Sequence, residues 1–192
     1  MATKIVSQEA ENYFAYYRTQ YGWEVQVLRA DDAIRPNFEH MVKEWNPDLI
    51  VYIGHGMQGK LLGQCPRCWD EPLLDIKNVD LLRGRKIVAI ACYGGTLGKD
   101  AIAAGAEMYV GFMDLVYVGG WEPDHNYVAD FVATFMNIII NTAKEMEPKE
   151  ILEDYVRLCN YYISLYNERK WEFYETYAMY MEHNRDILKI FV

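Results

Sequence analysis

Cysteine, positive charge and long apolar runs are all scarce in this chain. The only cysteines among its 192 residues are Cys65, Cys68, Cys92 and Cys159. Four cysteines are too few for the disulfide framework of a secreted domain of this size. The N-terminal residues hold no long apolar stretch before the first acidic residues, so we expect no signal peptide. These absences together predict a protein of the reducing cytoplasm.

Apolar runs in the sequence are short. The longest candidate for a membrane span, residues 131–140, is interrupted by Thr134 and Asn137. Because a spanning helix needs about 20 predominantly apolar residues, we predict no membrane partner. Lysine and arginine number 19 against 28 acidic residues, a formal net charge of −9. An acidic surface repels a phosphate backbone, so nucleic acid is not an expected partner either.

The composition that remains is typical of a folded globular chain. Hydrophobic residues make up 52% of the sequence and charged residues 24%, which argues against a disordered polymer. The length suits one α/β domain, and we predict a single domain over residues 1–192. Sixteen tyrosines are present. Tyrosine suits surfaces that are half apolar and half wet, so a homo-oligomer or a regulatory protein partner is conceivable.

Strand and helix patterns alternate along the first two-thirds of the chain. Helical spacing of apolar residues predicts helices over 9–21 and 34–45. Strand patterns fall at 4–7, 23–28, 49–53, 86–91 and 107–112. From about residue 124 to 192 the pattern is helical. This order predicts an α/β fold, with a mostly parallel sheet, helices on both faces and a C-terminal helical portion.

Two candidate reactive residues each follow a buried strand. His55 follows the apolar run 49–53 with only Gly54 between them, and Cys92 comes directly after the strand pattern 86–91, which is apolar from Ile87 onward. Continuous apolar runs of this kind indicate strands that are covered on both faces, as in a parallel sheet. Ligands of such sheets bind beyond the carboxyl ends of the strands. If the two strands are neighbours, the imidazole and the sulfur open onto one crevice.

A histidine and a cysteine in that position are suited to nucleophilic catalysis. A thiolate attacks a carbonyl carbon far better than a thiol, and a neighbouring imidazole can accept the proton. The glycines on either side of His55 allow the backbone to approach a substrate closely. The N–H groups of Gly56 and Cys92 could then donate to a developing oxyanion.

These segments resemble the motifs of a known peptidase group. The run Leu-Ile-Val-Tyr-Ile-Gly-His55-Gly56, followed by Lys-Ile-Val-Ala-Ile-Ala-Cys92-Tyr-Gly-Gly, is similar to the His-Gly and Ala-Cys motifs of caspase-like (clan CD) cysteine peptidases. Gingipain, separase and the CHAT-type proteases belong to that group. The later Gly105-Ala106 and Val-Gly111-Phe are similar to the strand after the catalytic cysteine in CHAT and gingipain-like members. The resemblance covers roughly residues 47–120.

The resemblance implies a caspase–haemoglobinase fold and a thiol protease. It makes Cys92 the nucleophile, His55 the acid and base, and the backbones of Gly56 and Cys92 the oxyanion hole, with a peptide or protein as substrate. Acidic pocket residues in this group suit cleavage after basic residues, and Asp114 and Asp124 are the candidates. Each is equally well explained as a loop carboxylate or a helix cap.

Cys65 and Cys68 form a Cys-x-x-Cys pair in a loop rich in glycine. Such a pair can supply half of a zinc site, but zinc prefers four ligands and the sequence holds no second pair. The other interpretations are a disulfide, a redox pair, a site shared between two chains, or two unpaired thiols. No other cofactor is expected.

Two further functions compete with the peptidase. The fold could be an inactive binding or scaffold module that works through its acidic, tyrosine-rich helical half. A phosphate-binding loop is disfavoured, because in the segment 94–99 Lys99 is followed by Asp100 rather than by serine or threonine.

Overall fold

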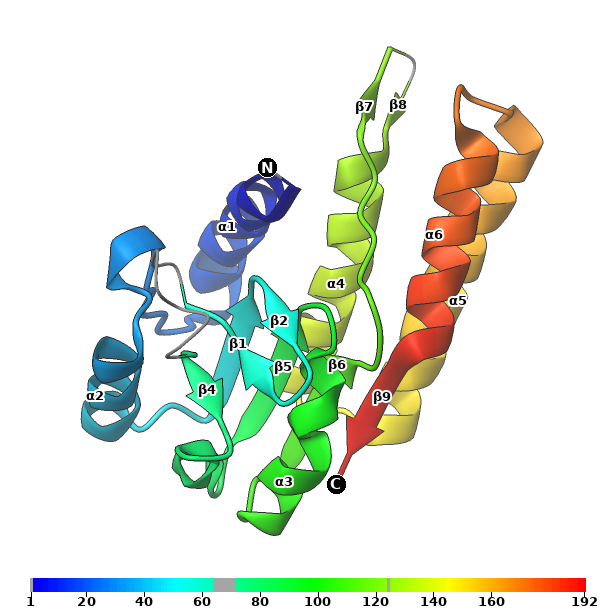
Figure 1. Ribbon diagram of the computed structural model, residues 1–192. Helices are drawn as coiled ribbons and strands as arrows, with labels where there is room; N and C mark the ends of the chain where they lie inside the picture. The colour runs from blue at the N-terminus through cyan, green and yellow to red at the C-terminus, as the bar shows by residue number, and fades with distance from the viewer. Residues whose placement is uncertain (1, 64–71, 124) are drawn as a thin grey trace.

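The computed structural model describes residues 2–63, 72–123 and 125–192. It is an α/β protein, as the alternating patterns predict, and the described residues contain six α-helices. Its main sheet has four strands, mostly parallel (Figure 1). The first three strands in the order run parallel and the last is antiparallel to its neighbour. Their order across the sheet is β1 (Leu49–Ile53), β5 (Lys86–Ile90), β6 (Met108–Phe112) and β9 (Leu188–Phe191).

Helices cover both faces of this sheet, because the strands are apolar on both faces. Val88 and Ile90 of β5 lie in one core with residues of α4, and Ile87 and Ala89 lie in a second core on the opposite face. The first core is enclosed by α1 (Ala2–Tyr21), α4 (Tyr127–Ala143), α5 (Pro148–Arg169) and α6 (Tyr174–Ile187). The second is enclosed by α2 (Arg35–Trp45) and α3 (Gly98–Ala103).

A small antiparallel sheet lies between β1 and β5 in the sequence. It consists of β2 (Gly56–Met57), β3 (Lys60–Leu61) and β4 (Leu74–Asp75). Leu61 and Leu74 are buried in the second core, so this sheet packs against α2 and α3. Gly56, the residue after His55, is therefore part of a packed hairpin.

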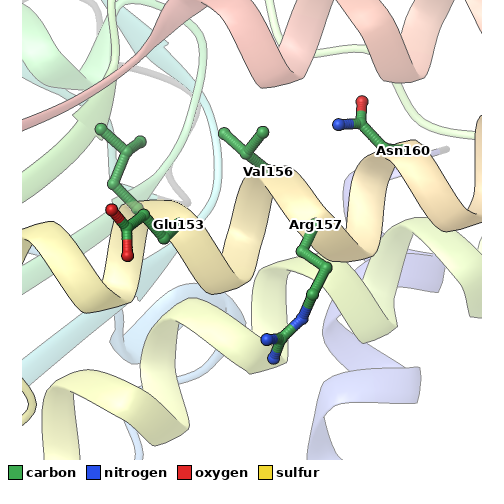
Figure 2. Close-up of a pocket in the computed structure, with 5 residues that line it drawn as sticks. Glu153, Val156, Arg157 and Asn160 are labelled. Atoms are coloured by element: carbon green, nitrogen blue, oxygen red, sulfur yellow. The ribbon is translucent and has the colours of Figure 1, made fainter.

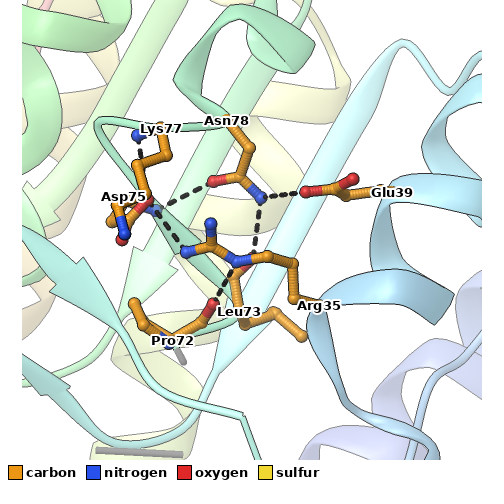
Figure 3. Close-up of polar contacts among 7 residues, drawn as sticks. All are labelled: Arg35, Glu39, Pro72, Leu73, Asp75, Lys77 and Asn78. Atoms are coloured by element: carbon orange, nitrogen blue, oxygen red, sulfur yellow. Dashed lines mark hydrogen bonds and ion pairs between the residues drawn. The ribbon is translucent and has the colours of Figure 1, made fainter. Parts of the chain in front are cut away.

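Polar contacts fasten β4 to α2 (Figure 3). Arg35 of α2 makes an ion pair with Asp75, with Nη2 and Oδ1 2.9 Å apart, and its Nε donates to the Pro72 carbonyl at 2.8 Å. Asn78 joins the same cluster, since its side-chain nitrogen donates to Glu39 at 3.0 Å and to the Leu73 carbonyl at 3.0 Å. The Arg35 and Asp75 side chains are only 12% and 8% exposed. This cluster holds residues 72–78 against α2.

Two predicted strands are absent from the fold. Residues 4–7 belong to α1. Residues 23–28, predicted as a strand from the alternation of Trp23 with two valines, form no strand, and β1 is an edge of the main sheet in the described residues. The Trp23 ring instead stacks on Tyr17 and Tyr21 of α1, at 5.5 and 5.9 Å between centroids. Packing on the helix replaces pairing with β1.

The portion predicted to be helical, about residues 124–192, is largely helical, but it also contains the strands β8 and β9. β7 (Trp121–Glu122) pairs with β8 (His125–Asn126) before α4 begins. The last strand, β9, was not distinguished from the helical portion by its sequence, and it pairs with β6. Phe191 at its end packs edge-on against Tyr109 of β6, with centroids 6.5 Å apart.

None of the helices in the described ranges is both long and apolar enough to cross a membrane.

Candidate active site

His55 and Cys92 lie side by side at the carboxyl edge of the main sheet. β1 and β5 are adjacent and parallel, and Ile53 pairs with Ile90 in their register. The Gly54 N–H donates to the Ile90 carbonyl at 3.2 Å, so pairing continues past the end of β1. Two residues beyond the last pair, the same register sets His55 opposite Cys92. The prediction that the two strands are neighbours is confirmed.

Strand alternation in β1 and β5 predicts the same side of the sheet for both side chains. Val51 and Ile53 of β1 contact the core formed with α1 and α4, and so do Val88 and Ile90 of β5. Side chains two residues apart on an extended chain point the same way. His55 and Cys92 lie two residues beyond Ile53 and Ile90, the last residues of the two strands. A shared side for their side chains is what the alternation predicts, and it stays a prediction. His55 is exposed and Cys92 is half-buried.

Gly56 brings the hairpin into contact with the backbone of Cys92. A Cβ atom at this position would lie 2.3 Å from the Cys92 carbonyl oxygen and 3.0 Å from the Ala91 Cβ. The preceding carbonyl, that of His55, accepts a bond from the Leu62 N–H at 2.9 Å and lies 2.6 Å from the donating hydroxyl of Tyr52. These contacts fix the chain on the carboxyl side of the His55 Cα atom, and the bond from Gly54 to Ile90 fixes it on the amino side.

The two N–H groups predicted to form an oxyanion hole are available in this arrangement. Because the Leu62 N–H bonds the His55 carbonyl, the next pair along the hairpin, Gly56 with Leu61, is a non-hydrogen-bonded pair. The Gly56 N–H therefore points away from β3. Within the described part of the chain, neither this group nor the Cys92 N–H has a backbone acceptor. Whether they bind an oxyanion stays a prediction.

The Cys92 sulfur is contacted by the loop that follows β6. The Val116 N–H donates to Sγ at 3.3 Å, and the Val116 carbonyl lies 4.0 Å from the same atom. Tyr93, directly after Cys92, has a left-handed backbone (φ 56°), and its N–H donates to the Asp114 carbonyl at 2.9 Å. A non-glycine residue in this conformation is uncommon and typical of functional turns. A short 3-10 helix, Gly94–Leu97, follows this turn.

Asp114, the predicted pocket residue, lies on this same loop. The backbone N–H of Leu115 donates to its carboxylate at 2.8 Å and the Tyr93 hydroxyl also bonds it, so the pKa of Asp114 is lowered. The same bond to Asp114 raises the pKa of the Tyr93 hydroxyl. The carboxylate with the lowered pKa thus lies on the same loop as Val116, whose N–H contacts the Cys92 sulfur.

The other predicted site residues, Asp124, Cys65 and Cys68, lie outside the described residues. The zinc hypothesis for the Cys-x-x-Cys pair is therefore untested. In the ranges that the structure does describe, no group of three or more histidine, cysteine or acidic side chains is arranged to hold a metal ion.

Sequence patterns missed a buried histidine–carboxylate pair away from the dyad. His125 Nε2 lies 2.5 Å from Asp130 Oδ2, and the Tyr166 hydroxyl donates to the same oxygen at 2.9 Å. Burial raises the pKa of Asp130. The His125 ring stacks on Trp171, 3.8 Å between centroids. This pair joins β8, α4 and α5, and its only sequence signal was a histidine near a predicted helix start.

Two shallow hollows lie on other parts of the surface. One, of about 460 Å³, lies along α5 and is shown in Figure 2. It is lined by Leu152, Glu153, Val156, Arg157 and Asn160. The other, of about 340 Å³, lies between residues 26–28 and α2. Neither of these two hollows is lined by His55 or Cys92.

Gly56→Ala tests the close contact between the hairpin and Cys92. The added methyl group would meet a backbone oxygen, which cannot turn away as a side chain can. We expect the free energy of unfolding in urea to fall by about 2 to 3 kcal/mol. Gly59→Ala is the control, since its Cβ meets nothing within 4 Å and only its φ of 72° is strained, with an expected cost of about 1 kcal/mol. Equal costs would contradict the contact.

Comparisons with known proteins found no relative of this chain. No family model, no curated protein and no solved structure matches the chain.

Proposed function

We propose that this protein is a caspase-like cysteine peptidase in which Cys92 and His55 form the catalytic dyad. One observation supports the proposal: the two residues follow adjacent parallel strands that end at matching register positions on one edge of the sheet. A thiol and an imidazole at the carboxyl edge of such a sheet are positioned to act on one substrate. The caspase–haemoglobinase fold is part of the same proposal.

The chemistry would proceed through an acyl-enzyme. His55 accepts the thiol proton, and the Cys92 thiolate attacks the scissile carbonyl carbon and forms a C–S bond. The C–N bond breaks as the His55 imidazolium gives its proton to the leaving amine. Water then attacks the thioester while His55 accepts one of its protons. The C–S bond breaks, the acid product leaves, and the proton returns to sulfur.

The oxyanion of each tetrahedral intermediate would be bound by the N–H groups of Gly56 and Cys92. Both lack a backbone acceptor in the described residues, and both are held by the contact between the hairpin and the Cys92 backbone. Donors fixed before the reaction need no reorganisation as charge develops, which is why such groups lower the barrier effectively.

The substrate class we propose is a peptide or protein with a basic residue before the scissile bond. Asp114 supports this preference because its carboxylate has a lowered pKa and lies on the loop that contacts Cys92. Asp124 stays a second candidate for the same pocket. The net charge of −9 would also attract a cationic peptide, though salt screens this attraction beyond about 8 Å.

Asp114→Asn is expected to reduce the preference for basic residues. The ratio of kcat/KM for an arginyl over a norleucyl fluorogenic peptide should fall by roughly 10-fold or more, since one ion pair is lost. Because the pKa of Asp114 is lowered, the wild-type preference should persist as pH falls through the ordinary carboxyl range and be lost only below it. Asp100→Asn, an exposed change on α3, is the control. An unchanged ratio would remove Asp114 from the pocket.

Covalent labelling tests the peptidase proposal directly. A peptidyl acyloxymethyl ketone ending in arginine or lysine should label the wild-type chain, and mass spectrometry should locate the adduct on Cys92. His55→Ala should slow the labelling strongly, because the imidazole no longer supports the thiolate. Labelling that is equal at Cys92 with and without His55 would contradict the dyad.

The binding or scaffold module is the second candidate, and exposed apolar side chains on the C-terminal helices favour it. Phe173, Met179 and Tyr161 are 54%, 65% and 58% exposed, and the hollow of Figure 2 lies on the same helical half. Apolar surface of this kind is typical of a protein interface. Absence of labelling at Cys92, together with self-association by sedimentation or a stoichiometric protein partner, would support this function over the peptidase.

A further inference from the structure

The loop that contacts the Cys92 sulfur is itself held by α6. Asn184 accepts a hydrogen bond from the Tyr117 N–H at 3.0 Å and donates one to the Tyr117 carbonyl at 2.7 Å. The neighbouring His183 bonds the Leu115 carbonyl through Nε2 at 2.9 Å. These bonds lie on the two sides of Val116, whose N–H donates to the Cys92 sulfur.

Asn184 is specialised for this contact. It is fully buried, and both ends of its amide are used on one residue that lies 67 positions away in the chain. A buried amide is costly unless all its groups are bonded, so this pair of bonds defines one position for the loop. The ring of Tyr117 stacks on Tyr180, one turn earlier on α6, with centroids 4.5 Å apart. The backbone at Val116 is thus fixed from α6.

We infer that Asn184 is a positioning residue that holds the Val116 N–H against Cys92 and thereby favours the thiolate. A backbone N–H donates more strongly to an anion than to a neutral thiol, so it stabilises the charged form. The importance of this role for catalysis rests on the proposed peptidase function. The stabilisation of the Cys92 thiolate by the Val116 N–H does not depend on that function.

Four titratable side chains lie on the segments around this sulfur. They are His55 after β1, Tyr93 after Cys92 itself, Asp114 on the loop and His183 on α6. Substituting Asn184 leaves all four in the sequence. A change in the behaviour of the thiol in such a variant therefore reports the position of the loop.

The test is the pH dependence of Cys92 alkylation by iodoacetamide, followed by mass spectrometry of the peptide that contains Cys92. In Asn184→Ala the midpoint of the rate profile should move to higher pH by about one unit, a roughly tenfold slower reaction at pH 7. The limiting rate at high pH reports access to the sulfur and is fitted separately. His183→Ala, which removes one of the three bonds from α6 to the loop, should shift the midpoint in the same direction by less.

Asn141→Ala is the matched control, because it removes a buried amide that bonds Asp154 on α5 instead of this loop. Its midpoint should equal that of the wild type. The inference is overturned if the folded Asn184→Ala and His183→Ala variants keep the wild-type midpoint, or if the control shifts equally. If Asn184→Ala does not fold by circular dichroism, Asn184→Ser, which also leaves the four titratable groups in place, decides instead. A shifted midpoint in a protein that cleaves no peptide would refute the peptidase and retain this inference.

Discussion

Cys92→Ala should lower kcat/KM for a basic fluorogenic peptide by at least about a thousandfold, and His55→Ala should lower it by a similar factor. The first variant lacks the nucleophile, and the second lacks the group that accepts and returns its proton. Because the two act as one unit, the double variant should be no slower than either single variant. Kinetics with purified protein and circular dichroism of each variant are the measurements.

Cys159→Ala is the control for the loss of a thiol. Cys159 is fully buried on α5, and burial raises the pKa of its thiol to about 12, so it forms no thiolate near neutral pH. This variant should retain wild-type kcat/KM as long as it folds. Activity that survives in Cys92→Ala, or that disappears equally in Cys159→Ala with its fold intact, would refute the assignment of the nucleophile.

The second large effect is expected at the ion pair between Arg35 and Asp75. Arg35→Met keeps the apolar stem of the side chain but leaves the Asp75 carboxylate without its cationic partner in a buried setting. Removing one member of a buried pair is strongly unfavourable, and we expect the free energy of unfolding to fall by about 3 kcal/mol. Urea denaturation of both proteins gives this difference.

An exposed pair of the same type provides the comparison. Arg29 and Glu11 form an ion pair in which the side chains are 61% and 41% exposed, so Arg29→Met should cost less than about 1 kcal/mol. Since Arg35 fastens β4, which pairs with β3 and through it with Gly56, the Arg35 variant should also lose peptidase activity. Equal costs for the two arginines would mean that the cluster of Figure 3 contributes little to stability.

The central part of the fold could be predicted because its signals are local. The runs 49–53 and 87–91 are continuously apolar, the first stops at Gly54 and the second at Cys92, and strands that are consecutive in such patterns usually pair. From those three facts the adjacency of His55 and Cys92 follows without coordinates. The parallel register then shows that β1 and β5 end at the same level, with Ile53 paired to Ile90.

Other parts depend on contacts between distant residues and have no local signal. Residues 23–28 alternate like a strand, but the Trp23 ring is drawn into a stack with Tyr17 and Tyr21. Residues 188–191 are too short to show a period, and only pairing with β6 makes them a strand. The hydrogen bond from the Tyr117 N–H to Asn184 joins residues that are 67 positions apart in the chain, and no rule of sequence spacing predicts it.

A crystal structure of the wild-type chain with a basic peptidyl electrophile bound to Cys92 would test the shared use of these two side chains most directly. The account predicts an imidazole nitrogen of His55 within about 4 Å of the Cys92 sulfur or of the bound carbonyl group, with the peptide lying across the carboxyl edge of β1 and β5. An imidazole on the opposite side of the sheet from the adduct would contradict it.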